Sequence, residues 1–130
     1  MKPGPQSIAR WLLVLSAVML AAGASMHGLA YRKVSAIAEQ STLPSLFQAA
    51  FKGLWLGESI SSLALALLLV CIAANPRLAA TPLILLLALI PIGWAAALFS
   101  TMGSFFAGYL LLLAAASTLL AAALRPRAGS

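Results

Sequence analysis

Residues 54–74 read LWLGESISSLALALLLVCIAA, and this stretch decides the class of the protein. It contains a single charged side chain, Glu58. About 20 predominantly apolar residues are enough for an α-helix to cross the hydrocarbon core of a bilayer, because each residue advances a helix by about 1.5 Å. The stretch therefore predicts a membrane-spanning helix. Asn75-Pro76 ends it, because proline disfavours helical geometry in the residue before it.

Three further stretches of the same kind make up most of the remaining sequence. Together with the first, they predict spans at about residues 11–31, 54–74, 82–100 and 105–124. We therefore predict an all-α integral membrane protein, built as a four-transmembrane-helix bundle with short loops. The whole chain, residues 1–130, is expected to form a single transmembrane domain.

The composition supports this class. Of the 130 residues, 63% are hydrophobic and 8% are charged, and the mean hydropathy is +1.06. A soluble domain of this size needs more charge to cover its surface, so the lipid bilayer is the expected surrounding of most of the chain. The net charge of +6 does not form a basic patch, because the basic residues lie near the ends of the predicted spans. Binding to nucleic acid is therefore not expected.

Local signals refine the ends of the spans. Thr81 is predicted to be an N-cap, followed by a proline at the first helical position. Pro91 lies inside the third span and predicts a kink, because it removes a backbone donor. Residues 101–104 are too few for more than a tight turn, so the last two spans are expected to form an antiparallel hairpin. Residues 32–43 are expected to extend the first helix beyond the membrane before Pro44 starts the next.

The distribution of basic residues predicts the orientation. The two tails and the loop between the second and third spans share one side, and they hold Lys2, Arg10, Arg77, Arg125 and Arg127. The opposite side holds Arg32, Lys33 and Lys52. Both termini are therefore predicted to be cytoplasmic. The small size and the Ala/Leu-rich composition favour a bacterial inner membrane.

The first span has a second interpretation, as a cleaved signal peptide. Lys2 and Arg10 would form its basic region, residues 11–20 its apolar core, and residues 22–24 its small-residue cleavage site. The apolar character continues beyond that site through Ala30, which favours a retained helix. The intact mass of the mature protein distinguishes the two interpretations.

Two ionisable side chains are expected within the spans, His27 in the first and Glu58 in the second. Each lies about four residues, or about 6 Å, below the non-cytoplasmic end of its helix. A carboxylate and an imidazole at one depth can share a proton or a hydrogen bond, which lowers the cost of burying both. The candidate binding cluster consists of this pair and polar or aromatic residues of similar depth: His27, Glu58, Trp55, Ser59, Tyr31 and Tyr109.

Three interpretations of this cluster stay open. The side chains can simply reach the headgroups and form an aromatic belt, pack as a polar cluster that fixes helix register, or form a substrate or proton site. No cofactor or metal site is expected, because His27 has no second strong ligand. No catalytic residue is assigned. The single cysteine, Cys71, permits no internal disulfide and is interpreted as a small packing residue.

Small residues recur at every fourth position in three of the spans. The rows are Ala17, Ala21 and Ser25; Gly53, Gly57 and Ser61; and Gly93, Ala97 and Thr101. Such rows let helix backbones approach closely, which favours helix association in lipid. We expect these rows to hold the bundle together internally. Dimerisation through one of them is the alternative.

In size and helix count, the chain resembles small bacterial membrane proteins such as the small multidrug resistance transporters. Those transporters use a membrane-embedded glutamate in their first helix. The first predicted span has no carboxylate, so no site residue is carried over.

Three functional hypotheses follow. The first is a non-enzymatic accessory subunit that binds a larger membrane protein through its helix faces. The second is a small proton-coupled transporter that acts as a homo-oligomer, with Glu58 as the protonatable group. The third is a membrane enzyme that uses His27 and Glu58 on a lipid-like substrate.

Overall fold

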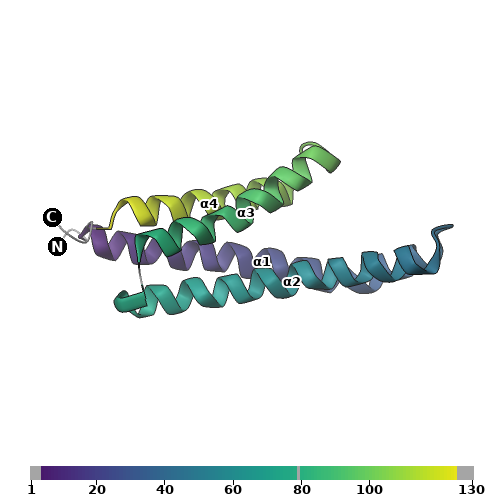
Figure 1. Cartoon of the computed structure of the whole chain (residues 1–130), viewed down its shortest axis with the longest axis horizontal. Coiled ribbons are helices and arrows are strands. Elements are labelled where there is room, and N and C mark those ends of the chain that lie inside the picture. The colour runs from purple at the N-terminus through teal and green to yellow at the C-terminus, as the bar shows by residue number, and fades with distance from the viewer. Residues whose placement is uncertain (1–3, 79, 126–130) are drawn as a thin grey trace.

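The computed structural model describes residues 4–78 and 80–125. The chain forms four long helices, α1 (Pro5–Glu39), α2 (Ser45–Ala74), α3 (Thr81–Met102) and α4 (Phe106–Ala123), and a short 3₁₀ helix, η1 (Pro76–Leu78). All four long helices are long and apolar enough to cross a membrane, and the described ranges contain no strand (Figure 1). The predicted all-helical class with four helices of transmembrane length is therefore confirmed.

Three pairs of helices pack extensively against each other. The helices α1 and α2 form one hairpin, α3 and α4 form a second, and the two hairpins meet where α1 packs against α4. The consecutive helices α2 and α3 do not form an interface of this kind, so the bundle is open between them. The start of α1 and the end of α4 lie at the same end of the molecule (Figure 1).

The two hairpins differ in length. Helices α1 and α2 have 35 and 30 residues, whereas α3 and α4 have 22 and 18. At about 1.5 Å per residue, α1 is about 52 Å long, which exceeds the roughly 30 Å of a hydrocarbon core. The first hairpin therefore extends past the turn between α3 and α4, as Figure 1 shows. We call residues 29–54, which include the connection between α1 and α2, the projecting hairpin.

The core of the bundle lies where α1 packs against α2 and α4. Its largest fully buried apolar side chains include Leu13, Leu69 and Ile72. The face of α4 that joins this core carries alanines, among them Ala114 and Ala121. Small side chains let the two helix axes come close, so van der Waals contact replaces the hydrophobic driving force that lipid removes.

Two of the three small-residue rows do not hold the bundle together, which corrects the prediction. Residues Gly53, Gly57, Ser61, Gly93, Ala97 and Thr101 are all exposed, and a Cβ added at any of the three glycines would meet nothing within 4 Å. The reason is that α3 packs through a different face, which buries Ile84, Ala88 and Ala95. In the first row, Ala17 is buried and Ser25 is exposed.

The predictions for Thr81 and Cys71 need correction, and the structure adds detail at Pro91 and at the turn after α3. Thr81 is not the N-cap of α3, because the helix already includes it, and Ala80 precedes it without a side-chain cap. Cys71 is exposed rather than packed in the core. Pro91 is buried inside an α3 that continues through it. The tight turn after α3 uses Gly103 at φ 68°, a conformation that glycine adopts at little cost.

A candidate polar site between α1 and α2

The carboxylate of Glu58 lies between two polar partners. Its Oε1 accepts a hydrogen bond of 2.8 Å from Ser62 Oγ, one turn further along α2. Its Oε2 lies 3.4 Å from Nε2 of His27 on α1. The side chains of His27 and Glu58 are 29% and 18% exposed, so both are largely removed from solvent. The structure thus brings together the two ionisable residues whose relative position helix spacing could not determine.

Trp55 holds the imidazole in place from the other side. The indole and imidazole rings stack with centroids 3.8 Å apart and planes 13° apart. The indole Nε1 donates a hydrogen bond of 2.8 Å to the backbone carbonyl of His27. Trp55 therefore contacts both the ring and the main chain of the histidine.

The distance between His27 and Glu58 is within ion-pair range, and the imidazole carries a charge only when it is protonated. The Nε2 atom is buried and makes no hydrogen bond within the described part of the chain. Its separation of 3.4 Å from Oε2 is longer than the usual 2.7–2.9 Å of a charged N–H···O bond. The carboxylate and the imidazole therefore lie close together without a direct hydrogen bond.

The cluster lies near the level at which α4 begins. A Cβ added at Gly23 would lie 3.3 Å from Leu110, so these two positions of α1 and α4 are opposite each other. His27 is one turn beyond Gly23, and Phe106, the first residue of α4, is one turn before Leu110. The polar cluster therefore lies where the shorter hairpin ends, at the base of the projecting hairpin.

The remaining predicted cluster residues are placed differently from one another. Ser59 is buried at the interface with α1, and its hydroxyl lies 4.0 Å from a Cβ added at Gly28. Tyr31 is half-buried and makes no side-chain hydrogen bond or ring contact with the described residues. Tyr109 is 51% exposed, and its nearest partners are Ser104 and Phe99 on the second hairpin.

The polar residues of α3 do not reach the cluster either. Ser100 and Thr101 both donate hydrogen bonds to the carbonyl of Ala97, within their own helix. The cluster predicted from sequence depth included Tyr109 of the fourth span. The contacts instead confine the cluster to α1 and α2, with His27, Trp55, Glu58, Ser59 and Ser62 as its members.

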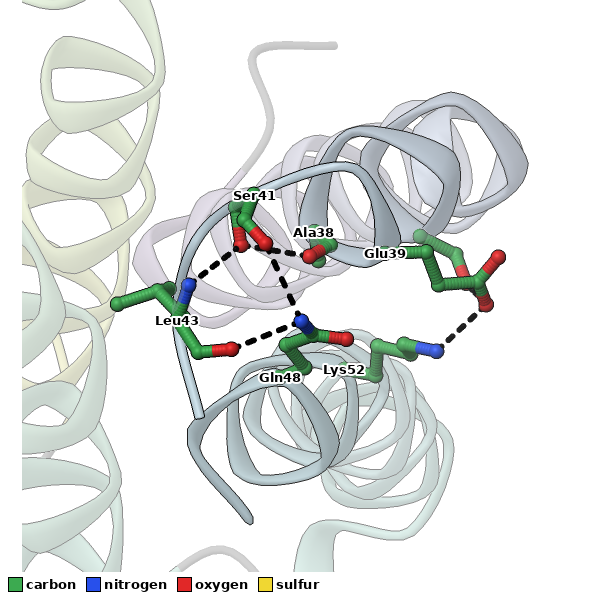
Figure 2. A network of polar contacts seen from close by, with 7 residues as sticks. Ala38, Glu39, Ser41, Leu43, Gln48 and Lys52 are labelled. Carbon is green, nitrogen blue, oxygen red and sulfur yellow. Dashed lines mark hydrogen bonds and ion pairs between the residues drawn. The ribbon is translucent and has the colours of Figure 1, made fainter. Parts of the chain in front are cut away.

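A second polar network closes the connection between α1 and α2 (Figure 2). Gln48 Nε2 donates to the carbonyl of Leu43 at 2.9 Å, and Ser41 Oγ donates to the carbonyl of Ala38 at 2.6 Å. These bonds satisfy backbone carbonyls that the helix end and the loop would leave unpaired. The connection is therefore held by its own side chains.

An ion pair lies beside this network. Lys52 Nζ is 2.6 Å from Glu39 Oε1, so Lys52 binds the carboxylate at the end of α1 rather than Glu58 (Figure 2). Glu39 lies about 12 Å past residue 31, beyond the predicted span. The hydrogen bond from Lys52, followed by its positive charge, lowers the pKa of the Glu39 carboxyl below its ordinary value.

One buried polar contact was not predicted from the sequence. Ser16 on α1 and Thr118 on α4 are buried, and their hydroxyl oxygens are 2.8 Å apart. Each hydroxyl oxygen also lies 2.9 Å from the carbonyl oxygen of Ala114 and can donate a hydrogen bond to it. A hydroxyl within each of two apolar spans was the signal that could have indicated this contact, since buried polar groups need partners.

These features define the class of the protein: a small all-helical chain with four helices of transmembrane length and one acid–imidazole pair between the first two. The described residues contain no group of three or more His, Cys, Asp or Glu side chains that could hold a metal ion. Comparisons with protein-family models, curated proteins and solved structures find no match.

Proposed function

We propose that this protein is a non-enzymatic interaction subunit of a multi-pass membrane complex, and that α2 binds a larger membrane partner. The observation that carries the proposal is the face of α2 opposite α1. Residues Ala50, Gly53, Gly57, Ser61 and Ala64 share this face at helical spacing, and all five are exposed. We call it the small-residue face of α2.

The shape of this face suits a second helix. Leu54 and Ile60 flank the row on its two sides and are 70% and 65% exposed, so the small residues lie between larger exposed apolar side chains. Glycine and alanine let a partner backbone approach closely, which is a main source of helix association in lipid. Among the long helices of the described chain, α2 packs extensively on α1 alone, and its opposite face is exposed.

In this proposal, the polar cluster positions α2. The contacts of Glu58 and Trp55 with His27 fix the register of α2 along α1 at this turn. A fixed register between these helices presents the small-residue face at a constant height in the membrane. The basic residues support the orientation proposed with it, in which both termini are cytoplasmic and the cluster lies near the outer surface of a bacterial inner membrane.

The test is the mass of the complex extracted in a mild detergent and measured by native mass spectrometry. Gly57→Leu should remove the partner, because a leucine side chain at this position keeps a second helix from approaching the backbone of α2 closely. Gly93→Leu is the matched control, because Gly93 is also an exposed glycine with open space around it, but on α3. Loss of the partner in the α2 variant alone supports the proposal. An unchanged complex in the Gly57→Leu variant, or a wild-type chain without any partner, refutes it.

A second function is favoured by one specific observation, the buried Nε2 of His27 beside the Glu58 carboxylate. This arrangement suits a proton-coupled transporter that works as a homo-oligomer, with Glu58 as the proton carrier. Glu58→Gln keeps the shape of the side chain and removes its charge. In proteoliposomes with an imposed pH gradient, the wild type would release protons and this variant would not. Equal proton flux in both would exclude this function.

A further inference from the structure

A groove lies between the start of α1 and the end of α2, at the opposite end of these helices from the polar cluster. It has a volume of about 300 Å³ and is lined by Ser7, Arg10, Trp11, Val14, Val70 and Ala73. Its walls are mainly apolar, and Arg10 is the cationic side chain among the lining residues. The groove contains none of the residues of the proposed interaction face.

Arg10 is held at this groove by the end of α2. Its Nε donates a hydrogen bond of 2.9 Å to the carbonyl of Ala73. The last carbonyls of an α-helix lack partners within the helix, so the guanidinium satisfies one of them. A guanidinium has five N–H donors, of which this bond uses one. Within the described ranges, no hydrogen bond engages the two terminal nitrogens of Arg10.

No acidic side chain of the protein can neutralise Arg10. The sequence has two acidic residues, Glu39 and Glu58, and both lie toward the other end of the first hairpin. Along α2, Glu58 is about 22 Å from Ala73, the residue that Arg10 binds. Arg77 in η1 adds a further positive charge at this end. Arg10 is exposed, and neither acidic side chain of the sequence is its partner, so an anion from outside the chain can reach the guanidinium.

We propose that this groove binds one anionic phospholipid. The lipid phosphate accepts hydrogen bonds from the terminal nitrogens of Arg10, whose planar fork matches phosphate oxygens. The acyl chain lies against Val14 and Val70. Trp11 is 70% exposed beside the groove and lies at headgroup level, where tryptophan is favoured. Basic pockets between helices are a known means of holding anionic headgroups.

The experiment uses the full chain in a mild detergent, with lipid binding measured by native mass spectrometry. The probes are phosphatidylglycerol and phosphatidylcholine with identical acyl chains. We expect one tightly bound phosphatidylglycerol and an affinity about fivefold or more above that for phosphatidylcholine. Arg10→Gln should remove this preference. Arg77→Gln is the matched control, because it removes one charge from the same end but lies outside the groove, and it should keep most of the preference.

A second variant tests the groove itself. Val70→Trp fills the space without changing charge, at an exposed position where a larger side chain does not disturb the core. It should weaken phosphatidylglycerol binding by about the same factor as Arg10→Gln. Unchanged binding in either variant overturns the proposal, as does an equal loss in Arg77→Gln, which would indicate only general attraction to a basic surface. Competition by inorganic phosphate at millimolar concentration would also overturn it, because the site would then recognise a free anion.

Discussion

The two hairpins of this protein are stabilised in different ways. The α1–α2 hairpin is long, carries both acidic residues of the sequence, and joins its helices by contacts between specific polar side chains. The α3–α4 hairpin is short, and the hydroxyl groups of Ser100, Thr101 and Tyr109 bond within their own helix or turn. No side-chain hydrogen bond joins α3 to α4 in the described part of the chain, and the hydroxyl of Thr118 contacts α1 instead. The ring of Phe99 on α3 packs against Gly108 and Tyr109 on α4. The first hairpin is therefore specified by hydrogen bonds and charge, and the second by shape.

This difference has a physical reason. In lipid, apolar side chains gain nothing by moving from one apolar surrounding to another, so helices associate through close packing or polar contacts. Polar contacts fix one register, because a shift by one residue would break them. Close packing alone tolerates more than one helix register. A large ring packed against a glycine restricts the register, as the ring of Phe99 does at Gly108. The predictions that follow test this contrast, from the largest expected effect to the smallest.

The largest effect is expected where the two hairpins meet. Ser16→Leu places a large side chain at a fully buried position beside Thr118 and Ala114. Overpacking of this kind costs about 1–3 kcal/mol, and here it would push α1 and α4 apart. SDS-induced unfolding in mixed micelles, followed by circular dichroism, measures the loss. Ser16→Ala is the control, and it should cost about 0.6 kcal/mol, the value of an average interhelical hydrogen bond. Equal stability of Ser16→Leu and wild type would contradict this account of the interface.

The next effect concerns the polar cluster. Glu58→Ala removes the carboxylate that accepts a hydrogen bond from Ser62 and lies beside His27, and we expect a loss of about 1–2 kcal/mol, because polar contacts in lipid are worth at most about 1.7 kcal/mol each. The same unfolding measurement should show this loss. Tyr109→Phe, which removes a hydroxyl from the second hairpin, should change stability by less than about 0.5 kcal/mol, because that side chain is exposed. If the two variants were equally stable, polar contacts would not distinguish the hairpins.

Two glycines, Gly108 in the second hairpin and Gly28 in the first, test how tightly each hairpin is packed. A Cβ added at Gly108 would lie 2.8 Å from the Phe99 ring, whereas one added at Gly28 would lie 4.0 Å from the Ser59 hydroxyl. Gly108→Ala should therefore destabilise by about 1 kcal/mol, and Phe99→Leu should rescue part of this loss. Gly28→Ala should be neutral or slightly stabilising, because alanine favours helix more than glycine. A neutral Gly108→Ala would show that the ring moves aside freely.

The smallest effect is expected at the Glu39–Lys52 ion pair, because it is exposed. The pKa of Glu39 is lowered in the folded protein. Its contribution to stability is therefore present above the ordinary pKa of glutamate and is lost as the pH falls through the folded value. Glu39→Gln should lower the thermal unfolding temperature slightly at pH 7 and not at pH 3. A difference that persists at acidic pH or in 1 M salt would show that charge is not its cause.

The sequence by itself determined the four helices and the turn between the last two. Apolar length, proline and glycine act locally, so residues 54–74 predict a helix without reference to the rest of the chain. The same local information predicted the extension of the first helix toward Glu39 and the end of α2 at Asn75. It also identified His27 and Glu58 as the ionisable residues that most need a partner.

The tertiary structure alone decided which helices are neighbours. Helical spacing shows which residues share a face, but apolar faces of similar composition do not indicate which partner each one meets in lipid. For this reason the sequence could not show that α4 packs on α1, that the row at Gly53 faces outward, or that Tyr109 lies apart from the cluster. The contact between His27 and Glu58 likewise depends on the register of two helices, which only their packing determines.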